Sequence, residues 1–594
     1  MEDSQLKIAF RYAQKAQLLH QQGNQAEAVK YYRQFLKIDP KNPVALSNMG
    51  VALFELGKLN ESSKAYRQAL KIDSEIPGVL ANLGNVLCSL DKLDEAVTCY
   101  RKAISLDPSN FIFYQGLGSA LEKKGDLEGA LACCQKVLVM DPSNTQILAD
   151  VFLMLRNLCW WEEAEDLTST LDQLNLDTPF TSVFRCDDPS KNFEVAKKWS
   201  QQIIGRISDE KIFSHARKHE GYKGKIRIGY LSSDFLNHPT AHLMLSLFKL
   251  HDRKQFEVFV YSYGRDDGSS YRTQISKDCD RFIDLEGVND FEAAELIFKD
   301  RIDILVDLKG YTLNNRLEIC ALRPSPIQVA YLGFPGTTGS SFFDYAIVDE
   351  ISVPRDQAPF YSEKLAFLPH CYQVNDYRQK ISKTIFRRSD FGLPEKSIVF
   401  SSFNQTYKIE PGVFSVWMEI LKAVPGSVLW QLKSNVYVEK KLNKEAEKRG
   451  VDPERIVFAS KIPKAEHLAR LALADLGLDT LIYNGHTTTS DALWAGVPVV
   501  TLQGKHFASR VSSSILTAVG LPELITHSLA EYKKLALRLA KNPKQLKEMK
   551  GRLSYNRAVK PLFDTPRFCR NLEKAYLRMW KIYQKGQKSQ QIYV

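Results

Sequence analysis

Several features are absent from this 594-residue sequence, and each absence argues against a class of protein. No apolar run approaches the roughly 20 residues that a membrane-spanning helix needs, so we expect no membrane partner. The first residues, Met1-Glu-Asp-Ser-Gln, lack the apolar core of a secretory signal. The 10 cysteines form no CxxC pair and no metal-ligand spacing with histidine. We therefore expect reduced thiols, a cytoplasmic location and no metal site.

The sequence also lacks a strong charge of either sign. Its 80 Lys and Arg against 69 Asp and Glu give a net charge of +11, which is mild for this length. The basic residues are spread along the chain, apart from a basic tail near 581–588. This pattern indicates a solvated surface and argues against a nucleic-acid partner. The composition is that of an ordinary globular protein, and the length predicts several domains.

A unit of 34 residues repeats through the first quarter of the chain. Asp-Pro occurs at Asp39, Asp107 and Asp141, and Asp73-Ser74 occupies the slot between the first two. Columns of small residues, glycine and tyrosine keep the same step: Ala28, Ser62, Ala96 and Ala130; Gly50, Gly84 and Gly118; Tyr32, Tyr66 and Tyr100. This is the tetratricopeptide pattern of two antiparallel helices per unit. It predicts an α-helical superhelix that serves as a binding surface.

Two asparagines mark a candidate peptide-binding face of the predicted repeats. About four full repeats and a decaying fifth, with Ala164 in the small-residue column, occupy 1–175. Asn48 and Asn82 each lie two residues before a column glycine. At this position of the concave face an amide can bind an extended peptide backbone. A solvated polar position is the alternative interpretation.

From Lys225 onward, short apolar strands alternate with helical patterns in two successive series. Alternation of this kind predicts parallel, doubly wound sheets, whose ligands bind beyond the carboxyl ends of the strands. The predicted strands are 226–231, 256–261, 302–306, 328–332 and 345–348, then 397–400, 427–431, 455–458, 476–479 and 498–501. The predicted domains are the repeats at 1–175, a helical join at 176–222, an N-terminal lobe at 223–385, a C-terminal lobe at 386–560, and a C-terminal helix with a basic tail at 561–594.

The segment 485–488, Gly-His-Thr-Thr, is the most informative of the motifs. It follows a strand that ends near Asp479 and leads into a helix expected to start near Thr489. Free N–H groups at a helix start, together with three hydroxyls, suit a diphosphate. Asp491, in the first turn, could hold a ribose hydroxyl. A threonine-rich helix cap without a ligand is the alternative.

Two further motifs lie in the second series. Lys408 ends the stretch 403–408, directly after a strand, and can place a point charge on a phosphate or a leaving group. Lys464, His467 and Arg470 are spaced to share one helix face. That face could contact a base edge, and a solvated basic face is the alternative.

The first series contributes three loops. In the stretch 232–242, Asp234 and His238 are candidates for an acid–base or orienting pair, with a purely structural histidine as the alternative. The run 333–339 has the wrong glycine spacing for a dinucleotide fingerprint and predicts a tight loop that lets backbone approach a ligand. Asp278-Cys-Asp280 is interpreted as surface charge rather than as a metal-binding motif.

Together these motifs resemble family 41 of the glycosyltransferases, the protein O-GlcNAc transferases and their bacterial relatives. The resemblance covers nearly the whole chain and rests on 232–242, 403–408 and 484–491, supported by 321–328 and 332–336. It implies a tetratricopeptide superhelix followed by a GT-B fold of two Rossmann-like lobes. It also implies a UDP-sugar donor, a protein Ser/Thr acceptor, inversion at the sugar carbon, and neither metal nor other cofactor.

The resemblance further implies a role for each matching residue. Lys408 would stabilise the departing UDP and, with Gln405, hold its uridine and diphosphate. The uracil would be contacted by Ile462, Pro463, Lys464, His467 and Arg470, the phosphates by His486, Thr487 and Thr488, and the ribose by Asp491. The sugar pocket would be formed by Pro239, Thr240, Leu332, Gly333 and Tyr407. The residues nearest the reacting hydroxyl would be Asp234, Asn237 and His238.

The sequence departs from the animal members of the family in two places. They carry an extra domain between the lobes, whereas here only about 376–396 joins them, as in the bacterial type. They also have a His-His-Ser-Met segment before the first lobe, one His of which has been proposed as the base. The nearest segment here, 179–183, has no histidine. The base is therefore unassigned among His238, Asp234 and the donor's own phosphate.

The function that these observations predict is transfer of GlcNAc from UDP-GlcNAc to Ser or Thr of proteins recruited by the repeats. The expected partners are UDP-GlcNAc and protein or peptide acceptors on the concave face, and a homodimer through the repeats is left open. The alternatives are a Spindly-like fucosyltransferase that uses GDP-fucose, a glucosyltransferase that acts on Asn, and a non-catalytic scaffold.

Overall fold

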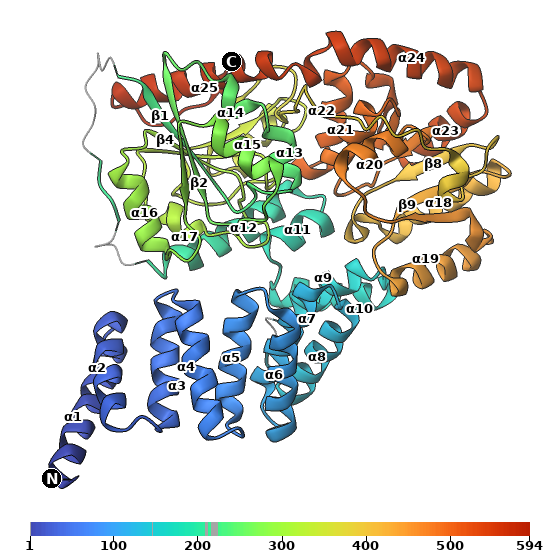
Figure 1. The fold of residues 1–594 in the computed structure, drawn as a ribbon. Coiled ribbons are helices and arrows are strands. Elements are labelled where there is room, and N and C mark those ends of the chain that lie inside the picture. Colours follow the sequence, from blue (N-terminus) through green and yellow to red (C-terminus); the bar gives the residue numbers. More distant parts are fainter. Residues whose placement is uncertain (1, 145–146, 208–211, 216–223) are drawn as a thin grey trace. The chain divides into compact units, whose positions relative to one another are not determined.

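A computed structural model of the chain describes residues 2–144, 147–207, 212–215 and 224–594 (Figure 1). Within that part the chain divides into two units, Met1–Leu155 with Gly287–Asn289, and Arg156–Glu286 with Asp290–Val594. The predicted boundary at 222 and 223 lies outside the described residues. No helix in the described ranges is long and apolar enough to cross a bilayer.

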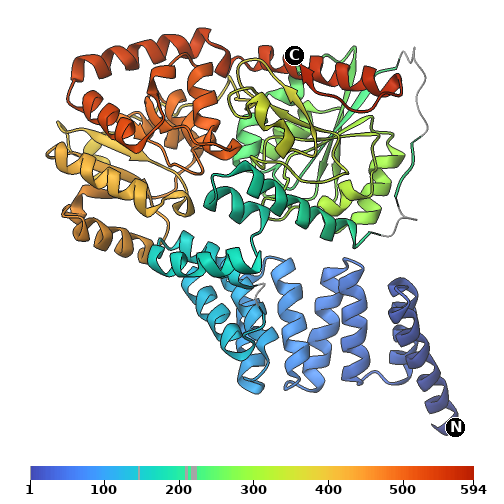
Figure 2. The same cartoon turned by 180° about the vertical axis from the view of Figure 1, so that it is seen from behind.

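The first unit consists of antiparallel helix pairs stacked side by side (Figures 1 and 2). This arrangement confirms the predicted tetratricopeptide array. Its helices are α1 (Glu2–Gln21), α2 (Gln25–Ile38), α3 (Pro43–Glu55), α4 (Leu59–Ile72), α5 (Pro77–Ser89), α6 (Leu93–Leu106), α7 (Phe111–Lys124), α8 (Leu127–Met140) and most of α9 (Ile147–Asn157). Several begin at a side-chain cap, as at Asn42, whose amide oxygen accepts a hydrogen bond from Ala45 N at 3.0 Å.

The columns of small residues explain how each pair packs. A Cβ added at Gly84 would lie 2.8 Å from the Tyr100 ring, and one at Gly50 would lie 2.8 Å from the Tyr66 ring. The tyrosines therefore fill the space that the glycines leave. Ser62, which stands in the alanine column, is fully buried and donates to Gly50 O at 2.7 Å.

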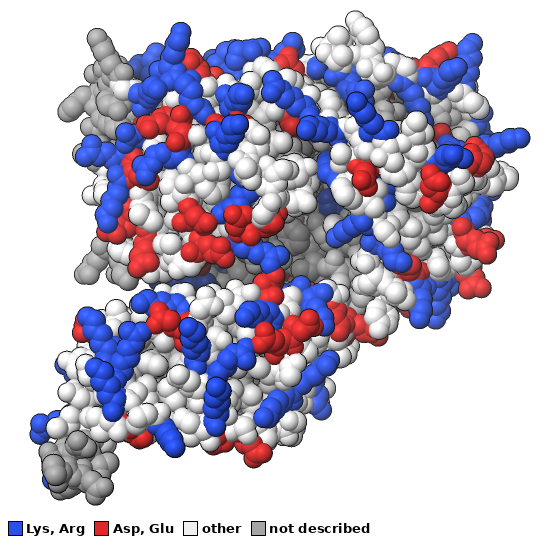
Figure 3. Space-filling view, in the orientation of Figure 1, with Lys and Arg blue, Asp and Glu red and all other residues white. Residues whose placement is uncertain are grey.

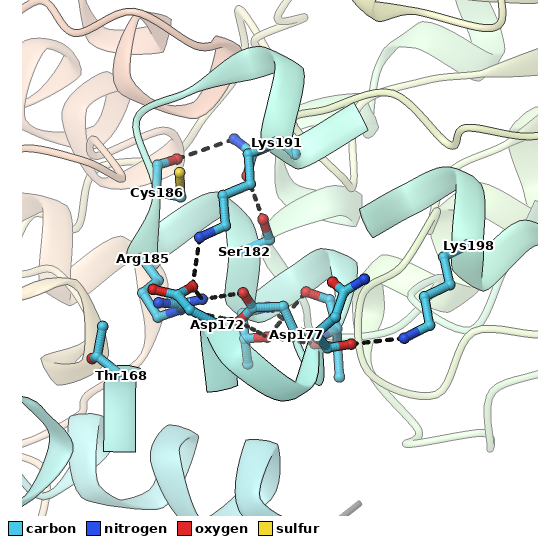
Figure 4. A network of polar contacts seen from close by, with 12 residues as sticks. Thr168, Asp172, Asp177, Ser182, Arg185, Cys186, Lys191 and Lys198 are labelled. Atoms are coloured by element: carbon cyan, nitrogen blue, oxygen red, sulfur yellow. Dashed lines mark hydrogen bonds and ion pairs between the residues drawn. The ribbon is translucent and has the colours of Figure 1, made fainter. Parts of the chain in front are cut away.

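The second unit begins with the helices that follow the repeats, α10 (Trp161–Leu174), α11 (Pro179–Arg185) and α12 (Pro189–Ile204). A polar network joins them (Figure 4). Arg185 donates to Asp172 at 2.7 Å and to Asp177 at 3.0 Å, and Lys191 donates to Asp172 at 2.5 Å. These contacts fix α11 between its neighbours, which matters because α11 contributes to the site below.

Two parallel sheets form the body of the second unit. The sheet of the first lobe has the order β14-β7-β6-β5-β4-β1-β2-β3, and that of the second has the order β10-β9-β8-β11-β12-β13. The strands are β1 (Ile226–Ser232), β2 (Phe256–Ser262), β3 (Arg281–Asp284), β4 (Ile304–Asp307), β5 (Ile327–Ala330), β6 (Tyr345–Val348), β7 (Lys364–Phe367), β8 (Val399–Ser402), β9 (Val428–Leu432), β10 (Ile456–Ala459), β11 (Leu476–Leu478), β12 (Val499–Leu502), β13 (Ile525–Thr526) and β14 (Ile592–Tyr593). The predicted two-lobe α/β fold is confirmed.

Helices pack around the two sheets. The first lobe has α13 (Pro239–Met244), α14 (Leu247–Leu250), α15 (Ser270–Asp278), α16 (Asp290–Lys299) and α17 (Leu317–Ala321); the second has α18 (Pro411–Ala423), α19 (Val436–Lys448), α20 (Lys464–Leu471), α21 (Thr487–Trp494), α22 (Val511–Ala518), α23 (Leu529–Ala540) and α24 (Pro543–Val559). In the segment 561–594, where the sequence predicts a helix and a basic tail, α25 (Thr565–Gln584) lies along the first lobe in both views (Figures 1 and 2). It is followed by β14, which pairs with β7.

The strand order places the motifs at equivalent points of the two lobes. From β1 the chain builds outward through β2 and β3, and it then returns to add β4 on the other side of β1. The second lobe repeats this with β8 and β11. Each lobe therefore has a switch point, where loops diverge and leave a crevice at the carboxyl ends of the strands. The loops after β1, β4, β8 and β11 carry Asp234, Lys309, Lys408 and His486, respectively.

Candidate functional site

Lys408 lies in the short turn η4 (Thr406–Lys408) after β8. Its side chain is 8 % exposed and donates from Nζ to Asn484 O at 2.8 Å. The same nitrogen lies 3.9 Å from the centroid of the Tyr483 ring. Burial lowers the pKa of Lys408 to about 7, against the opposing charge of Asp479. The structure thus brings the buried side-chain nitrogen of Lys408 onto the loop after β11.

The loop after β11 is shaped around Asp479. This carboxylate is 1 % exposed and accepts from Gly485 N at 2.6 Å and from Thr501 Oγ1 at 2.7 Å. A Cβ at Gly485 would lie 2.4 Å from Thr489 Oγ1, so the close turn requires glycine. The turn leads into α21, which starts at Thr487, two residues earlier than predicted.

The start of α21 is suited to an anion. The first N–H groups of a helix have no acceptor within it, and the helix dipole places partial positive charge there. Thr488 Oγ1 donates to Asn404 Oδ1 at 2.6 Å, which ties this turn to the loop after β8. Burial holds the pKa of His486 well below its usual range, so the imidazole is neutral. The His486 ring centroid lies 4.9 Å from that of Tyr483, which Lys408 also contacts, so the residue that precedes α21 lies near the ammonium.

Asp491 and Lys464 form an ion pair between α21 and α20 through Asp491 Oδ2. The other oxygen, Oδ1, is buried and has no hydrogen-bond partner within the described part of the chain. A buried acceptor without a partner is costly, and a ligand hydroxyl would satisfy it. This geometry suits the ribose contact expected of Asp491.

His467 and Arg470, which the spacing placed on one helix face, are in contact but differ in exposure. His467 is half-buried, and its ring centroid lies 5.0 Å from that of Phe403. Arg470 is 1 % exposed and donates from Nε to His467 Nδ1 at 3.3 Å. Arg470 therefore lies behind the histidine and orients it. Burial lowers the pKa of His467 to about 3, so the ring is neutral and its proton is on Nε2.

In the first lobe, Asp234 follows β1 and is bound by a residue that the sequence analysis missed. Lys309, after β4, donates to the two oxygens of Asp234 at 2.9 and 3.0 Å. Both side chains are buried, with 7 % of Asp234 and 4 % of Lys309 exposed. The pair follows from the adjacency of β1 and β4 at the switch point, which the sequence alone does not reveal.

His238 lies beside this ion pair. Its Nδ1 is 3.5 Å from Asp234 Oδ2 and accepts from Thr240 N at 3.3 Å, which caps α13. Burial lowers the pKa of His238, and the charge of Asp234 opposes that shift. Asn237 is exposed and its Oδ1 lies 2.8 Å from His242 Nε2. His238 therefore has a structural role as a helix cap, besides any role with a substrate.

The expected sugar pocket combines a strained loop with an aromatic cluster. Leu332 has a φ of 67°, a backbone conformation unusual for leucine. A Cβ at Gly333 would lie 2.0 Å from Leu308 O, so this loop packs directly on the backbone after β4. Tyr407 packs edge-to-face against Phe180 of α11, with ring centroids 5.7 Å apart. The segment that lacks the histidines of the animal members thus supplies an aromatic side chain, Phe180.

The two lobes face one another across a cavity of about 900 Å³. Asn237, His242 and Tyr271 line it from the first lobe, and Pro463 and Lys464 line it from the second. Burial, together with the positive charge of Lys464, lowers the pKa of His242 to about 3. Pro239 is exposed, Thr240 is buried, Gln405 is exposed and Ile462 is half-buried.

The two candidate peptide-binding asparagines belong to the first unit. Asn48 lies on α3 and Asn82 on α5, and both are half-buried. On the face shown in Figure 3, basic and acidic side chains are interspersed, in keeping with a solvated surface.

Comparison with known proteins gives consistent results along the chain. The model of Glycosyl transferase family 41 matches residues 178–387 and 380–572, and models of the TPR repeat match 16–57, 51–90 and 84–125. A further tetratricopeptide repeat model matches 112–144.

Relatives are found among curated proteins and solved structures. The probable UDP-N-acetylglucosamine–peptide N-acetylglucosaminyltransferase SEC of Arabidopsis thaliana is 40% identical, over 73% of this chain and 47% of its own length. The corresponding Caenorhabditis elegans transferase is 33% identical, over 63% and 42%. A probable transferase named SPINDLY from Oryza sativa is 35% identical, over 60% and 39%.

The chain thus spans less than half the length of these curated relatives. A structure of a Thermobaculum terrenum O-GlcNAc transferase mutant matches with a TM-score of 0.68 and 28% identity, covering 92% of this chain and 98% of that one. With its repeats, its two lobes and these matches, the chain belongs to glycosyltransferase family 41.

Proposed function

We propose that this chain is an inverting, metal-independent protein O-glycosyltransferase that transfers GlcNAc from UDP-GlcNAc to Ser or Thr of proteins recruited by its repeats. The observation that carries the proposal is the buried Lys408 beside the start of α21. A UDP leaving group develops negative charge, and these two groups supply fixed positive charge at one place. The unpartnered oxygen of Asp491 supports a nucleotide with a free ribose hydroxyl.

In the proposed reaction the acceptor hydroxyl oxygen attacks the anomeric carbon of the sugar from the face opposite the diphosphate. The bond from that carbon to the phosphate oxygen breaks, and UDP departs toward Lys408 and α21. The hydroxyl proton passes to a base, for which Asp234, His238 and the donor's own phosphate are the candidates. The pairing of Asp234 with Lys309 fixes the orientation of this carboxylate.

The proposal assigns no metal ion to the reaction, because Lys408 and the helix start supply the charge that a cation would supply. Among the described residues, His251, Cys569 and Glu573 form the group that could hold an ion, and none of them is a candidate site residue. We expect transfer to be unchanged by EDTA and by added Mg²⁺ or Mn²⁺. Loss of transfer in EDTA that Mg²⁺ restores would contradict this part of the proposal.

Calorimetric titration of UDP and of GDP tests the nucleotide. We expect UDP to bind well ahead of GDP. A preference for GDP would indicate a Spindly-like fucosyltransferase, and binding of neither would favour a scaffold. Radiolabelled UDP-GlcNAc and UDP-glucose, each incubated with a protein mixture, then show which sugar the protein transfers.

Substitution of the leaving-group lysine tests the chemistry. Lys408→Ala should lower the rate of transfer at least about 100-fold, as loss of a preorganised electrostatic contact does. Lys533→Ala, at an exposed lysine that pairs with Glu419, serves as the control and should transfer normally. Full activity in Lys408→Ala, with its fold intact by circular dichroism, would remove the proposed role.

A further inference from the structure

The turn that carries Lys408 makes few hydrogen bonds of its own. η4 has three residues, and its two internal bonds are accepted by the carbonyls of Gln405 and Thr406. The carbonyls of Tyr407 and Ile409, on either side of Lys408, take no part in them. A single 3-10 turn is therefore a weak support for a side chain whose position matters.

Side chains from the end of α9 and the start of α10 bind both of these carbonyls. Arg156 Nη2 donates to Tyr407 O at 3.0 Å, and Trp161 Nε1 donates to Ile409 O at 3.0 Å. Arg156 is 9 % exposed and Trp161 is 6 % exposed. Hydrogen bonds sheltered from water in this way are strong, above all where the donor is charged.

Two further contacts reinforce this arrangement. Thr406 Oγ1 donates in the opposite direction, to Asn157 O at 2.6 Å. The Trp161 ring packs against Phe414 of α18, with ring centroids 5.3 Å apart. The segment 156–161 is thus bound to Thr406 and Tyr407 of the turn, to Ile409 directly after it, and to the helix that follows.

Arg156 also acts on the loop that holds the diphosphate site. Its charge opposes the effect of burial on Glu410, whose pKa burial raises to about 7. Glu410 Oε1 accepts from Ile482 N at 3.1 Å, two residues before Asn484, which binds Lys408. The guanidinium of Arg156 therefore binds the loop after β8, and its charge acts on the carboxylate that binds the loop after β11.

We propose that Arg156 and Trp161 are positioning residues for Lys408, which fix the backbone on both sides of it and so present its ammonium to the leaving diphosphate. The inference rests on the proposed function, in which Lys408 binds the diphosphate of UDP. Neither residue belongs to the two sheets or to the loops at their switch points. A displacement of the ammonium by about 1 Å would be costly, because such contacts depend steeply on geometry.

The test is UDP affinity, measured by calorimetry on the full chain. Arg156→Met keeps the aliphatic stem but removes the donors, and we expect about tenfold weaker binding, the usual effect of losing a charged hydrogen bond. Trp161→Phe keeps the packing against Phe414 and removes only the N–H, and we expect about a threefold loss. Arg156→Lys, which keeps the charge, should recover part of the affinity.

Arg455 provides a matched control in the same lobe. It donates to the backbone carbonyls of Ser427 at 2.7 Å and Leu421 at 2.7 Å, as Arg156 does to Tyr407, but it contacts no residue of the candidate site. Arg455→Met should leave UDP affinity unchanged while it lowers the melting temperature. A loss of UDP affinity equal to that of Arg156→Met would show that any buried arginine has this effect, and would overturn the inference.

A double-mutant cycle separates positioning from general support. In the Lys408→Ala background, Arg156→Met should cause no further loss of UDP affinity. An equal loss with and without Lys408, or no loss in either background, would overturn the inference. If Arg156→Met does not fold, the same cycle is run with Trp161→Phe. Failure of the unsubstituted protein to bind UDP would instead refute the proposed function.

Discussion

At the scale of single residues, the buried ammonium of Lys408 makes a prediction about pH. Its pKa is lowered to about 7 by burial, so part of the population is neutral at and above that pH. A bound diphosphate favours the charged form, and so raises this pKa. We expect UDP affinity to fall as the pH rises from about 6.5 to about 9, with proton uptake on binding. Calorimetry in buffers of different ionisation enthalpy measures that uptake.

The control for this pH dependence is Lys408→Ala. The terminal phosphate of UDP titrates in both proteins, so the difference between them reports the lysine. Equal proton uptake by the two proteins at about pH 8 would contradict the assignment of the pH dependence to Lys408. The substitution removes that titrating group, so its removal would then have no effect.

The ion pair of Asp234 and Lys309 makes a second prediction at this scale. Lys309→Met leaves the buried carboxylate without a partner, and removal of one member of such a pair costs about 3 kcal/mol. We expect that loss in the free energy of unfolding, measured in urea, together with loss of transfer. Asp234→Asn combined with Lys309→Met removes both charges and should recover most of the stability. Recovery of transfer as well would show that the carboxylate is not needed for the reaction.

The sequence predicted some of these residues and not others, for physical reasons. Lys408 could be proposed because it follows β8 within a few residues, and Asp491 because it lies in the helix that a glycine- and threonine-rich turn begins. Lys309 could not, because its partner is 75 residues earlier and the two meet only when β1 and β4 become neighbours. Phe180 was missed because only three-dimensional packing places α11 against Tyr407.

At the scale of helices and strands, local signals set the accuracy of prediction. The helices α18 and α25 both have proline in the first turn, after a polar residue, which is a local signal for the start of a helix. The strands β3, β7, β13 and β14 were not predicted. β13 and β14 have two residues each, too few for a periodic pattern, and β3 has no fully buried residue. Such strands form because a neighbouring strand is present.

The glycine columns of the repeats give a prediction for individual helices. Gly84→Ala places a methyl group 2.8 Å from the Tyr100 ring, between α5 and α6. Overpacking of this kind costs about 1–3 kcal/mol. Gly78→Ala, in the same helix, meets nothing within 4 Å and should stabilise α5 by about 0.5–1 kcal/mol. Hydrogen exchange of the α5 and α6 amides measures both effects locally, which a global melt of a multidomain chain does not. Slower exchange in Gly84→Ala than in the unsubstituted protein would contradict the packing argument.

At the scale of the whole molecule, the residues proposed to bind the donor and the residues proposed to bind the acceptor lie in different units. The residues proposed to hold UDP all lie in the second unit, where they follow the strands β8, β10 and β11 of the second lobe. The asparagines proposed to bind acceptor backbone lie in the first. On the proposed function, we therefore expect that donor binding and acceptor recruitment can be changed independently, which a single shared site would not allow.

The double substitution Asn48→Ala and Asn82→Ala tests this division. Loss of two amide contacts should lower kcat/KM for a protein acceptor roughly tenfold or more, and leave the affinity for UDP unchanged. The matched control is Lys37→Ala with Lys71→Ala, an exposed pair one repeat apart on the second helices α2 and α4. Equal losses in the two double variants would mean that the asparagines are ordinary surface positions. A fall in UDP affinity in the asparagine variant would mean that the repeats act on the donor site itself, and donor and acceptor binding would then be coupled through the chain.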